Sequence, residues 1–135
     1  MSRIKKAKIP YVNLSKQFQK EKKALIKEIE RVLSSGKYIL SEEVEKFEKG
    51  VCDYLKVKYC VGVNSGTDAL ILSLLSLNIG LGDEVITQAN SYIATGAAIS
   101  AVGAKPVFID VLDDQTMDSS KIKSVVNKRT KAIIP

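Results

Sequence analysis

Hydrophobic residues in the first part of the chain recur with the period of an amphipathic α-helix. Between Ser15 and about Ser34 they fall on one helical stripe, with lysines on the opposite side. The stripe consists of Phe18, Leu25, Ile29, Val32 and Leu33. Gly36 is placed to end this helix, because glycine readily takes the left-handed conformation of a C-cap. A second helix is predicted to begin after Ser41, which can cap it. Its apolar side consists of Val44, Phe47, Val51 and Leu55.

The pattern changes in the second part of the chain. Four short apolar runs follow, separated by stretches that are compatible with helices. The runs are Tyr59–Val63, Glu84–Gln88, Pro106–Asp110 and Lys131–Ile134, and the stretches between them are Thr67–Leu77, Ser91–Val102 and Ser119–Val126. Strands that alternate with helices at this spacing form right-handed crossovers, so we predict an α/β fold with a mainly parallel sheet. The segment Ala69–Leu77 is apolar nearly all round, and we expect it to be covered on both sides.

The composition of the 135 residues is close to the globular average and excludes several classes of protein. With 45% hydrophobic and 27% charged residues, the chain is not a disordered protein, a collagen or a coiled coil. Cys52 and Cys60 are too few for a disulfide scaffold and lack metal-ligand spacing. The absence of histidine excludes a His-based triad and a His-ligated zinc site within these residues.

The net charge of +6 is concentrated near the N-terminus. Residues 1–31 carry 10 basic and 3 acidic side chains, whereas residues 32–135 carry 11 and 12. A basic arm can bind nucleic acid or an anionic membrane, but no aromatic-rich groove accompanies it, so a solvated helix is the better interpretation. We therefore expect neither nucleic acid nor a membrane as a partner. Because the sequence has no run of about 20 apolar residues and no secretory signal, we expect a cytoplasmic location.

The residues that follow the first apolar run are suited to bind an anion. Ligands of a parallel sheet bind beyond the carboxyl ends of the strands, and Asn64–Asp68 occupies this position directly before a helix. Free N–H groups at a helix start attract phosphate, Gly66 allows close approach, and the hydroxyls of Ser65 and Thr67 can add hydrogen bonds. The same residue types also form an ordinary helix cap, and the local sequence leaves both interpretations open.

Three further features have a chemical and a structural interpretation. Tyr92 follows the second run, where its ring can stack on a planar heterocycle or lie half-buried between helix and sheet. The acidic stretch Asp110–Asp114 resembles a metal cluster, but a solvated turn followed by Asp118 as an N-cap is the better interpretation. Cys60 lies in an apolar run and is most simply a core residue.

A series of short motifs occurs in a fixed order along the chain. The motifs are Ser35–Leu40, Val44–Glu48, Ser65–Leu70, Gly80–Thr87, Tyr92–Thr95, Gly103–Asp110 and Arg129–Pro135. In order and spacing, the series resembles nucleotide-sugar aminotransferases of the DegT/StrS type from about Ile9 to the last residue. Each motif alone is weak, but the ordered series is specific.

The resemblance implies a fold, a cofactor and binding residues. Members of the family are fold-type-I enzymes that use pyridoxal phosphate (PLP) and are usually homodimers. Their large domain has three layers, with a mainly parallel sheet between flanking helices. By resemblance, Ser65, Gly66 and Thr67 belong to the cofactor site, with Gly66 and Thr67 holding the PLP phosphate. Tyr92 stacks on the pyridine ring.

The resemblance also implies a substrate and a reaction. Gly36 and Tyr38 match positions that contact the nucleotide-sugar, although the chain has Ser41–Glu42 where the family usually has Gly-Pro. An amino group, commonly from glutamate, is transferred to a keto group of the sugar, and the motifs favour 3-keto substrates. The Schiff-base lysine and the carboxylate that pairs with the pyridinium nitrogen match family segments beyond Pro135. No catalytic residue is therefore assigned within the chain.

These observations predict how the chain is organised and leave alternatives open. Residues 1–35 are expected to form a basic extension and a helix. Residues 36–135 are expected to form the N-terminal part of the PLP-binding large domain, without transaminase activity on its own. The alternatives are a PLP-dependent sugar dehydratase of the same family, a non-catalytic basic fragment that binds anions or nucleic acid, and a non-functional remnant.

Overall fold

The computed structural model describes residues 10–135. The chain divides between Cys60 and Val61 into two compact units. The basic residues expected at positions 1–8 lie outside the described residues, and the domain boundary predicted between residues 35 and 36 stays a prediction. Within residues 10–135, no helix combines the length and the apolar character that a membrane crossing requires.

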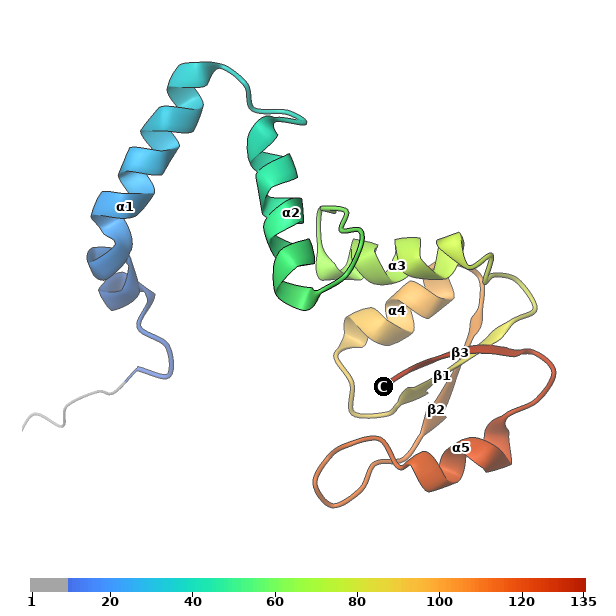
Figure 1. Ribbon diagram of the computed structural model, residues 1–135. Coiled ribbons are helices and arrows are strands. Elements are labelled where there is room, and N and C mark those ends of the chain that lie inside the picture. The colour runs from blue at the N-terminus through green and yellow to red at the C-terminus, as the bar shows by residue number, and fades with distance from the viewer. Residues whose placement is uncertain (1–9) are drawn as a thin grey trace, which may run out of the picture. The chain divides into compact units, whose positions relative to one another are not determined.

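Two helices make up the described part of the first unit, residues 10–60 (Figure 1). Helix α1 spans Leu14–Ser35 and helix α2 spans Glu42–Leu55. The side chain of Asn13 caps α1 by accepting a hydrogen bond from the backbone N–H of Lys16 at 3.0 Å. Helix α1 ends at Gly36, whose φ of 67° is the left-handed conformation expected of this C-cap. The extents of both predicted helices are confirmed, but the side chain of Ser41 makes no capping hydrogen bond to α2. Neither helix contains a buried residue.

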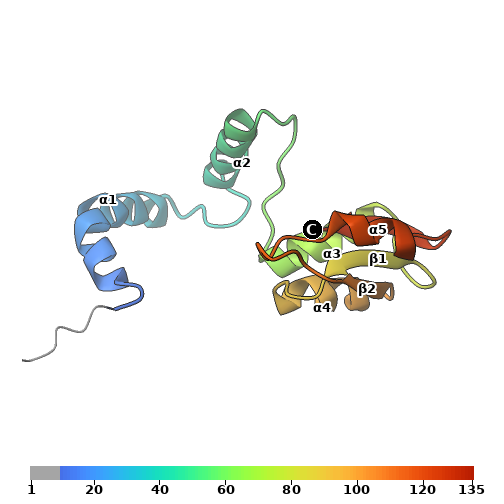
Figure 2. The same cartoon turned by 90° about the horizontal axis from the view of Figure 1, so that it is seen from below.

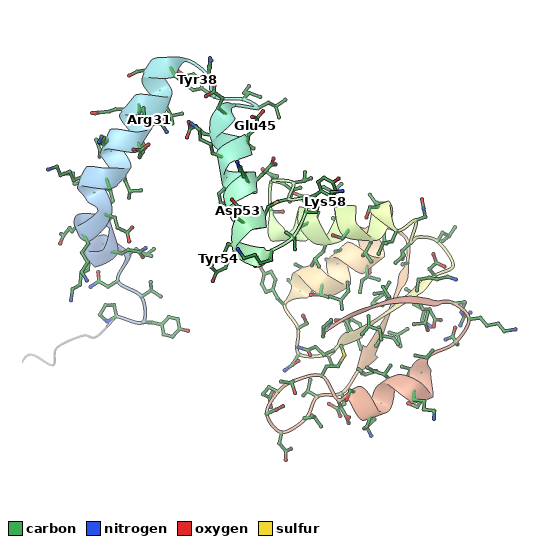
Figure 3. All side chains as sticks on the ribbon, in the orientation of Figure 1. Arg31, Tyr38, Glu45, Asp53, Tyr54 and Lys58 are labelled. Atoms are coloured by element: carbon green, nitrogen blue, oxygen red, sulfur yellow. The ribbon has the colours of Figure 1, made fainter. Side chains whose placement is uncertain are left out.

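An exposed cluster of charged side chains joins α1 to α2. Arg31, labelled on α1 in Figure 3, donates to both carboxylate oxygens of Glu43 on α2, at 3.1 and 2.8 Å. Glu28 accepts a further hydrogen bond from Arg31, and Lys46 donates to Glu43 at 2.9 Å. These contacts, the hydrogen bond from Arg31 first, lower the pKa of Glu43 to about 2. Because the side chains remain exposed to solvent, the cluster holds the two helices only weakly.

A three-stranded parallel sheet with helices forms the second unit. Its elements, in chain order, are α3 (Gly66–Ser76), β1 (Glu84–Gln88), α4 (Ile93–Ala101), β2 (Lys105–Ile109), α5 (Ser119–Val125) and β3 (Thr130–Ile134). The strand order is β2-β1-β3, and β1 pairs in parallel with both neighbours. The predicted α/β fold with a parallel sheet is confirmed.

The first predicted strand, Tyr59–Val63, is not a strand in this structure. Its valines and its tyrosine favour an extended backbone, but an extended segment becomes a strand only when a neighbour supplies a hydrogen-bonded ladder. The described sheet consists of β2, β1 and β3, and its ladders do not include this run. Tyr59 and Val61 are exposed. The strand prediction is therefore wrong for the described residues.

Helices lie on both faces of the sheet, which gives the unit three layers. Figure 2 shows α4 on one side of β1 and β2 and α5 on the other side. The core on the α3 and α4 side consists of Leu74, Ile79, Val85, Ile99 and Ala104. This core joins both helices to the central strand.

Helix α3 is covered on one side rather than on both. It packs against α4, and Leu74 is its buried residue. Leu72 and Leu75 are 49% and 50% exposed. The expectation of cover on both sides is thus wrong for the described residues, because α4 covers one side and no further layer covers the other.

A buried carboxylate fixes the amino end of the sheet. Glu84 begins β1 and is 4% exposed. It forms an ion pair with Arg129 at 2.7 Å and accepts a hydrogen bond from the side-chain amide of Asn127 at 2.7 Å. The hydrogen bond from Asn127, followed by the charges of Arg129 and Lys105, lowers the pKa of Glu84. The backbone N–H of Glu84 also donates to the carbonyl of Arg129 at 2.8 Å, so β1 is joined to the turn that precedes β3.

Candidate functional site

Helix α3 begins with a hydroxyl cap. Ser65 Oγ accepts a hydrogen bond from the backbone N–H of Asp68 at 3.1 Å and donates one to the Asp68 carboxylate at 2.9 Å. This arrangement is the ordinary cap that the sequence left open, and it occupies the hydroxyl proton of Ser65 within the helix. Ser65 therefore fixes the start of α3 and has no proton to offer to a phosphate in this geometry.

The next two backbone N–H groups are available to a ligand. The N–H of Ala69 donates to the carbonyl of Ser65 at 3.0 Å and closes the first turn. The N–H groups of Gly66 and Thr67 have no acceptor among residues 10–135. A Cβ added at Gly66 would meet no atom within 4 Å, so the space beside the Gly66 Cα is open. Two free N–H groups at the positive end of a helix fit a phosphate group.

Tyr92 lies at the start of α4 with its ring exposed. Its backbone is extended at the N-cap position, and its carbonyl accepts a hydrogen bond from the N–H of Thr95 at 3.0 Å. The hydroxyls of Ser91 and Thr95 share a hydrogen bond of 3.0 Å that closes the same turn. Because Tyr92 is 79% exposed, the half-buried interpretation is wrong here, and the ring is free to stack on a ligand.

The two helix starts lie on the same side of the second unit. Helix α4 follows β1 directly and therefore begins near the carboxyl end of that strand. Helix α3 packs against α4, and both figures draw the first residues of the two helices at the end toward which β1 runs. The free N–H groups and the Tyr92 ring are thus presented at the carboxyl edge of the sheet, where parallel sheets bind ligands.

Gly36 and Tyr38 line a pocket within the first unit. The pocket has a volume of about 420 Å³ and is formed by residues 36–42 and Glu45. Figure 3 shows Tyr38 at the loop between α1 and α2 and Glu45 in the first turn of α2. The hydroxyl of Tyr38 donates to the carbonyl of Leu33 at 2.8 Å, which ties the ring to the end of α1. The predicted site residues therefore form two sets, one in each unit.

The acidic stretch after β2 forms a turn and a helix cap. Asp114 accepts hydrogen bonds from the hydroxyl and the backbone N–H of Thr116, and these lower its pKa. Asp118 accepts a hydrogen bond from the N–H of Ser120 at 3.0 Å, so its predicted role as N-cap of α5 is confirmed. Among residues 10–135, no group of three His, Cys, Asp or Glu side chains is arranged to hold a metal ion.

Two residues beside the carboxyl edge, Asn90 and Gln115, were not predicted from the sequence. The side-chain amide of Asn90 donates to the carbonyl oxygen of Gln115 at 3.2 Å and to its Oε1 at 3.3 Å. The sequence offers one signal for Asn90, which is that a polar residue stands soon after a predicted strand. Its partner lies 25 residues further along the chain, and no local pattern connects the two.

These features define a class of protein and then a family. An open helix start beside an exposed aromatic ring, at the carboxyl edge of a parallel sheet, suits a phosphorylated planar ligand. The model of the DegT/DnrJ/EryC1/StrS aminotransferase family matches residues 19–135, and the chain belongs to this family. Enzymes of the family are in general PLP-dependent and have the fold-type-I architecture.

Proteins of known activity are similar across nearly the whole chain. The chain is 43% identical over 127 residues to dTDP-3-amino-3,6-dideoxy-α-D-galactopyranose transaminase of Aneurinibacillus thermoaerophilus, covering 93% of the chain and 35% of that protein. It is 40% identical over 129 residues to UDP-2-acetamido-2-deoxy-3-oxo-D-glucuronate aminotransferase of Pseudomonas aeruginosa. This match covers 94% of the chain and 36% of that protein.

The solved structures include the same fold. The structure of NtdA from Bacillus subtilis with bound cofactor PMP matches with a TM-score of 0.87 and 32% identity, over 98% of this chain and 31% of that one. The expected resemblance to fold-type-I aminotransferases is therefore confirmed. The chain spans about a third of the length of the relatives it matches.

Proposed function

We propose that the chain is the N-terminal part of a PLP-dependent aminotransferase that acts on a nucleotide-linked keto sugar. The observation that carries the proposal is the open start of α3, where the N–H groups of Gly66 and Thr67 are free. Membership of the family and the names of the two relatives support the reaction. Since the chain spans about a third of those relatives, the reaction is proposed for the whole protein.

The cofactor roles follow from the chemistry of each residue. Gly66 and Thr67 would hold the cofactor phosphate through their N–H groups, assisted by the dipole of α3. Ser65, which belongs to the predicted cofactor set, contributes by fixing the helix start. Tyr92 would lay its exposed ring against the pyridine ring. When bound, PLP supplies the electron sink for amino-group transfer.

The substrate roles belong to the first unit. Gly36 and Tyr38 line a pocket of about 420 Å³ and are proposed to contact the nucleotide-sugar. The two relatives are named for a 3-amino and a 3-oxo sugar, which supports a 3-keto substrate. Glutamate as amino donor, the homodimer and the cytoplasmic location stay predictions.

The covalent lysine is proposed to lie outside residues 1–135. None of the lysines stands in the family context of the Schiff-base residue. Lys37 pairs with Glu42 at 3.7 Å, and Lys105 pairs with Glu84 at 3.9 Å. The residues of this chain would therefore bind and orient, and the isolated chain is expected to lack transaminase activity.

Binding of pyridoxamine phosphate (PMP) to the chain tests the proposal, because this form of the cofactor binds without a Schiff base. We predict that Gly66→Val weakens PMP binding more than about tenfold, since a branched side chain beside the free N–H groups hinders close approach of the phosphate and weakens charge-assisted hydrogen bonds. Fluorescence titration of PMP measures the effect.

Gly50→Val is the matched control. Gly50 lies in α2, and an added Cβ there also meets no atom within 4 Å, so the substitution is sterically equivalent but distant from α3 along the chain. It is expected to leave PMP binding unchanged. Equal affinity of the Gly66→Val chain and the unsubstituted chain would contradict the phosphate site.

A further inference from the structure

The loop between β1 and α4 is tied to the β2 side of the sheet before it reaches Tyr92. The N–H of Ala89 donates to the carbonyl of Ile109 at 3.0 Å, which extends the β1–β2 ladder by one bond. Directly after this bond, Asn90 donates its side-chain amide to the carbonyl oxygen of Gln115 at 3.2 Å and to Oε1 at 3.3 Å. One donor group thus bridges the loop after β1 and the loop after β2.

The acceptor residue is held in an uncommon backbone conformation. Gln115 has a φ of 69°, in the left-handed region that residues other than glycine rarely adopt. Its N–H donates to the carbonyl of Leu112, and the N–H of Leu112 donates to the carbonyl of Thr116, both at 2.9 Å. This tight turn directs both the main-chain and the side-chain oxygen of Gln115 to the same amide of Asn90.

The ring of Tyr92 has no restraint of its own. It is 79% exposed, and its hydroxyl makes no hydrogen bond among the described residues. The loop backbone therefore sets the position of the Cα–Cβ bond of Tyr92, and with it the region that the ring can reach. The next side chain, that of Ser91, forms its hydrogen bond with Thr95 of α4. Before Tyr92, Asn90 is therefore the last residue whose side chain connects this loop to another loop.

We propose that Asn90, with Gln115 as its acceptor, is a positioning residue that orients Tyr92 for stacking on the cofactor ring. The inference rests on the proposed function of Tyr92. Through this tie, the loop after β2 contributes to cofactor affinity without touching the cofactor. When the tie is removed, the loop must be ordered during binding, which weakens affinity roughly fivefold.

Titrations with PMP, and with inorganic phosphate as competitor, test the inference on the full chain. Asn90→Ala removes both hydrogen bonds without adding charge. We predict that it weakens PMP binding roughly fivefold, leaves the affinity for inorganic phosphate unchanged and accelerates amide exchange at Ala89 of the same loop, whose N–H donates to the carbonyl of Ile109. Gln115→Gly keeps the carbonyl acceptor and suits the positive φ, so its effect is expected to stay below about twofold. Asn13→Ala makes the same substitution in the first unit and is expected to change neither affinity.

The outcomes separate the inference from the proposed function. If Tyr92→Leu weakens PMP binding but Asn90→Ala does not, the positioning role is overturned and the role of Tyr92 stands. If Asn90→Ala weakens PMP and phosphate binding equally, Asn90 only stabilises the fold, and the inference is overturned. If the unsubstituted chain binds PMP no more tightly than phosphate, the proposed role of Tyr92 fails, and the inference fails with it.

Discussion

The side chain of Thr87 carries a buried hydroxyl in the central strand of the sheet. The residue is fully buried in β1, and its Oγ1 has no hydrogen-bond partner among the described residues. An unpaired buried hydroxyl costs about 1–3 kcal/mol. We predict that Thr87→Val, which replaces the hydroxyl by a methyl group of similar size, raises the free energy of unfolding by about 1 kcal/mol. Urea denaturation measures the change.

Thr95 is the matched control for this substitution. It is also a buried threonine, but its hydroxyl is paired with that of Ser91 at 3.0 Å. Thr95→Val leaves the Ser91 hydroxyl without this partner and is expected to lower the free energy of unfolding by about 1 kcal/mol. A decrease for both variants would show that the Thr87 hydroxyl is paired in solution.

Glu84 makes the stability of the second unit depend on pH. The hydrogen bond from Asn127, and then the charges of Arg129 and Lys105, lower the pKa of Glu84 in the folded chain below its usual 4.5. The unfolded chain therefore takes up this proton at a higher pH than the folded chain. The stabilisation is present above the unfolded pKa and is lost as the pH falls through the folded pKa. We predict that Glu84→Gln flattens the decline of stability below pH 4.5.

Amide exchange in β1 as a function of pH measures this dependence within the second unit. Asp113→Asn serves as control, because Asp113 is an exposed carboxylate in the same unit. The control is expected to keep the acid-induced decline of the unsubstituted chain. An identical pH profile for Glu84→Gln and the control would be inconsistent with a stabilising Glu84 carboxylate.

At the scale of the elements, α1 and α2 depend on little besides their own hydrogen bonds. Neither helix contains a buried residue, and the pairs made by Arg31 and Glu43 are exposed. Isolated helices of this length are marginal in water, and exposed ion pairs add little. We predict that the amides of α1 and α2 exchange much faster than those of β1, whose Val85, Ile86 and Thr87 are fully buried.

Hydrogen exchange followed by NMR at several urea concentrations tests this difference. Amides of β1 are expected to exchange only through unfolding of the sheet, whereas those of α1 are expected to exchange through local opening at all concentrations. Protection of α1 equal to that of β1 would mean that its apolar stripe is covered in solution.

Local patterns explain which elements the sequence could predict. Periodicity and caps located the helices to within a few residues, because Gly36 and Asp118 act through neighbours in the chain. The segment Tyr59–Val63 was mistaken for a strand because its composition favours extension, whereas strand formation depends on a partner elsewhere. The exposed ring of Tyr92 was likewise undecided, since burial depends on packing between elements.

In the candidate site, too, local features could be predicted from the sequence, whereas contacts between distant residues could not. The free N–H groups of Gly66 and Thr67 could be predicted, because a helix start is a local signal and its unpaired N–H groups follow from helix geometry. Their role as a phosphate site stays a proposal. The bond between Asn90 and Gln115 joins residues 25 positions apart, and only the fold brings them together. The expected cofactor follows from the family resemblance, because no spacing in the chain specifies it.

At the scale of the whole molecule, the excess of positive charge and the proposed anion site belong to different units of the chain. The basic side chains are concentrated in residues 1–31, which belong to the first unit. The proposed phosphate site lies in the second unit and consists of backbone N–H groups at the start of α3. Within the second unit, the direction of α3 would therefore attract the phosphate to these N–H groups.

The central position of β1 has a consequence for synthesis on the ribosome. β1 is made before both of its neighbours, and Asn127, a close partner of the Glu84 carboxylate, follows 43 residues later. Early collapse around β1 would bury a charge without the hydrogen bond from Asn127 and the ion pair with Arg129, which is strongly unfavourable. Formation of the sheet in the nascent chain is therefore unfavourable until the residues that precede β3 have emerged from the ribosome.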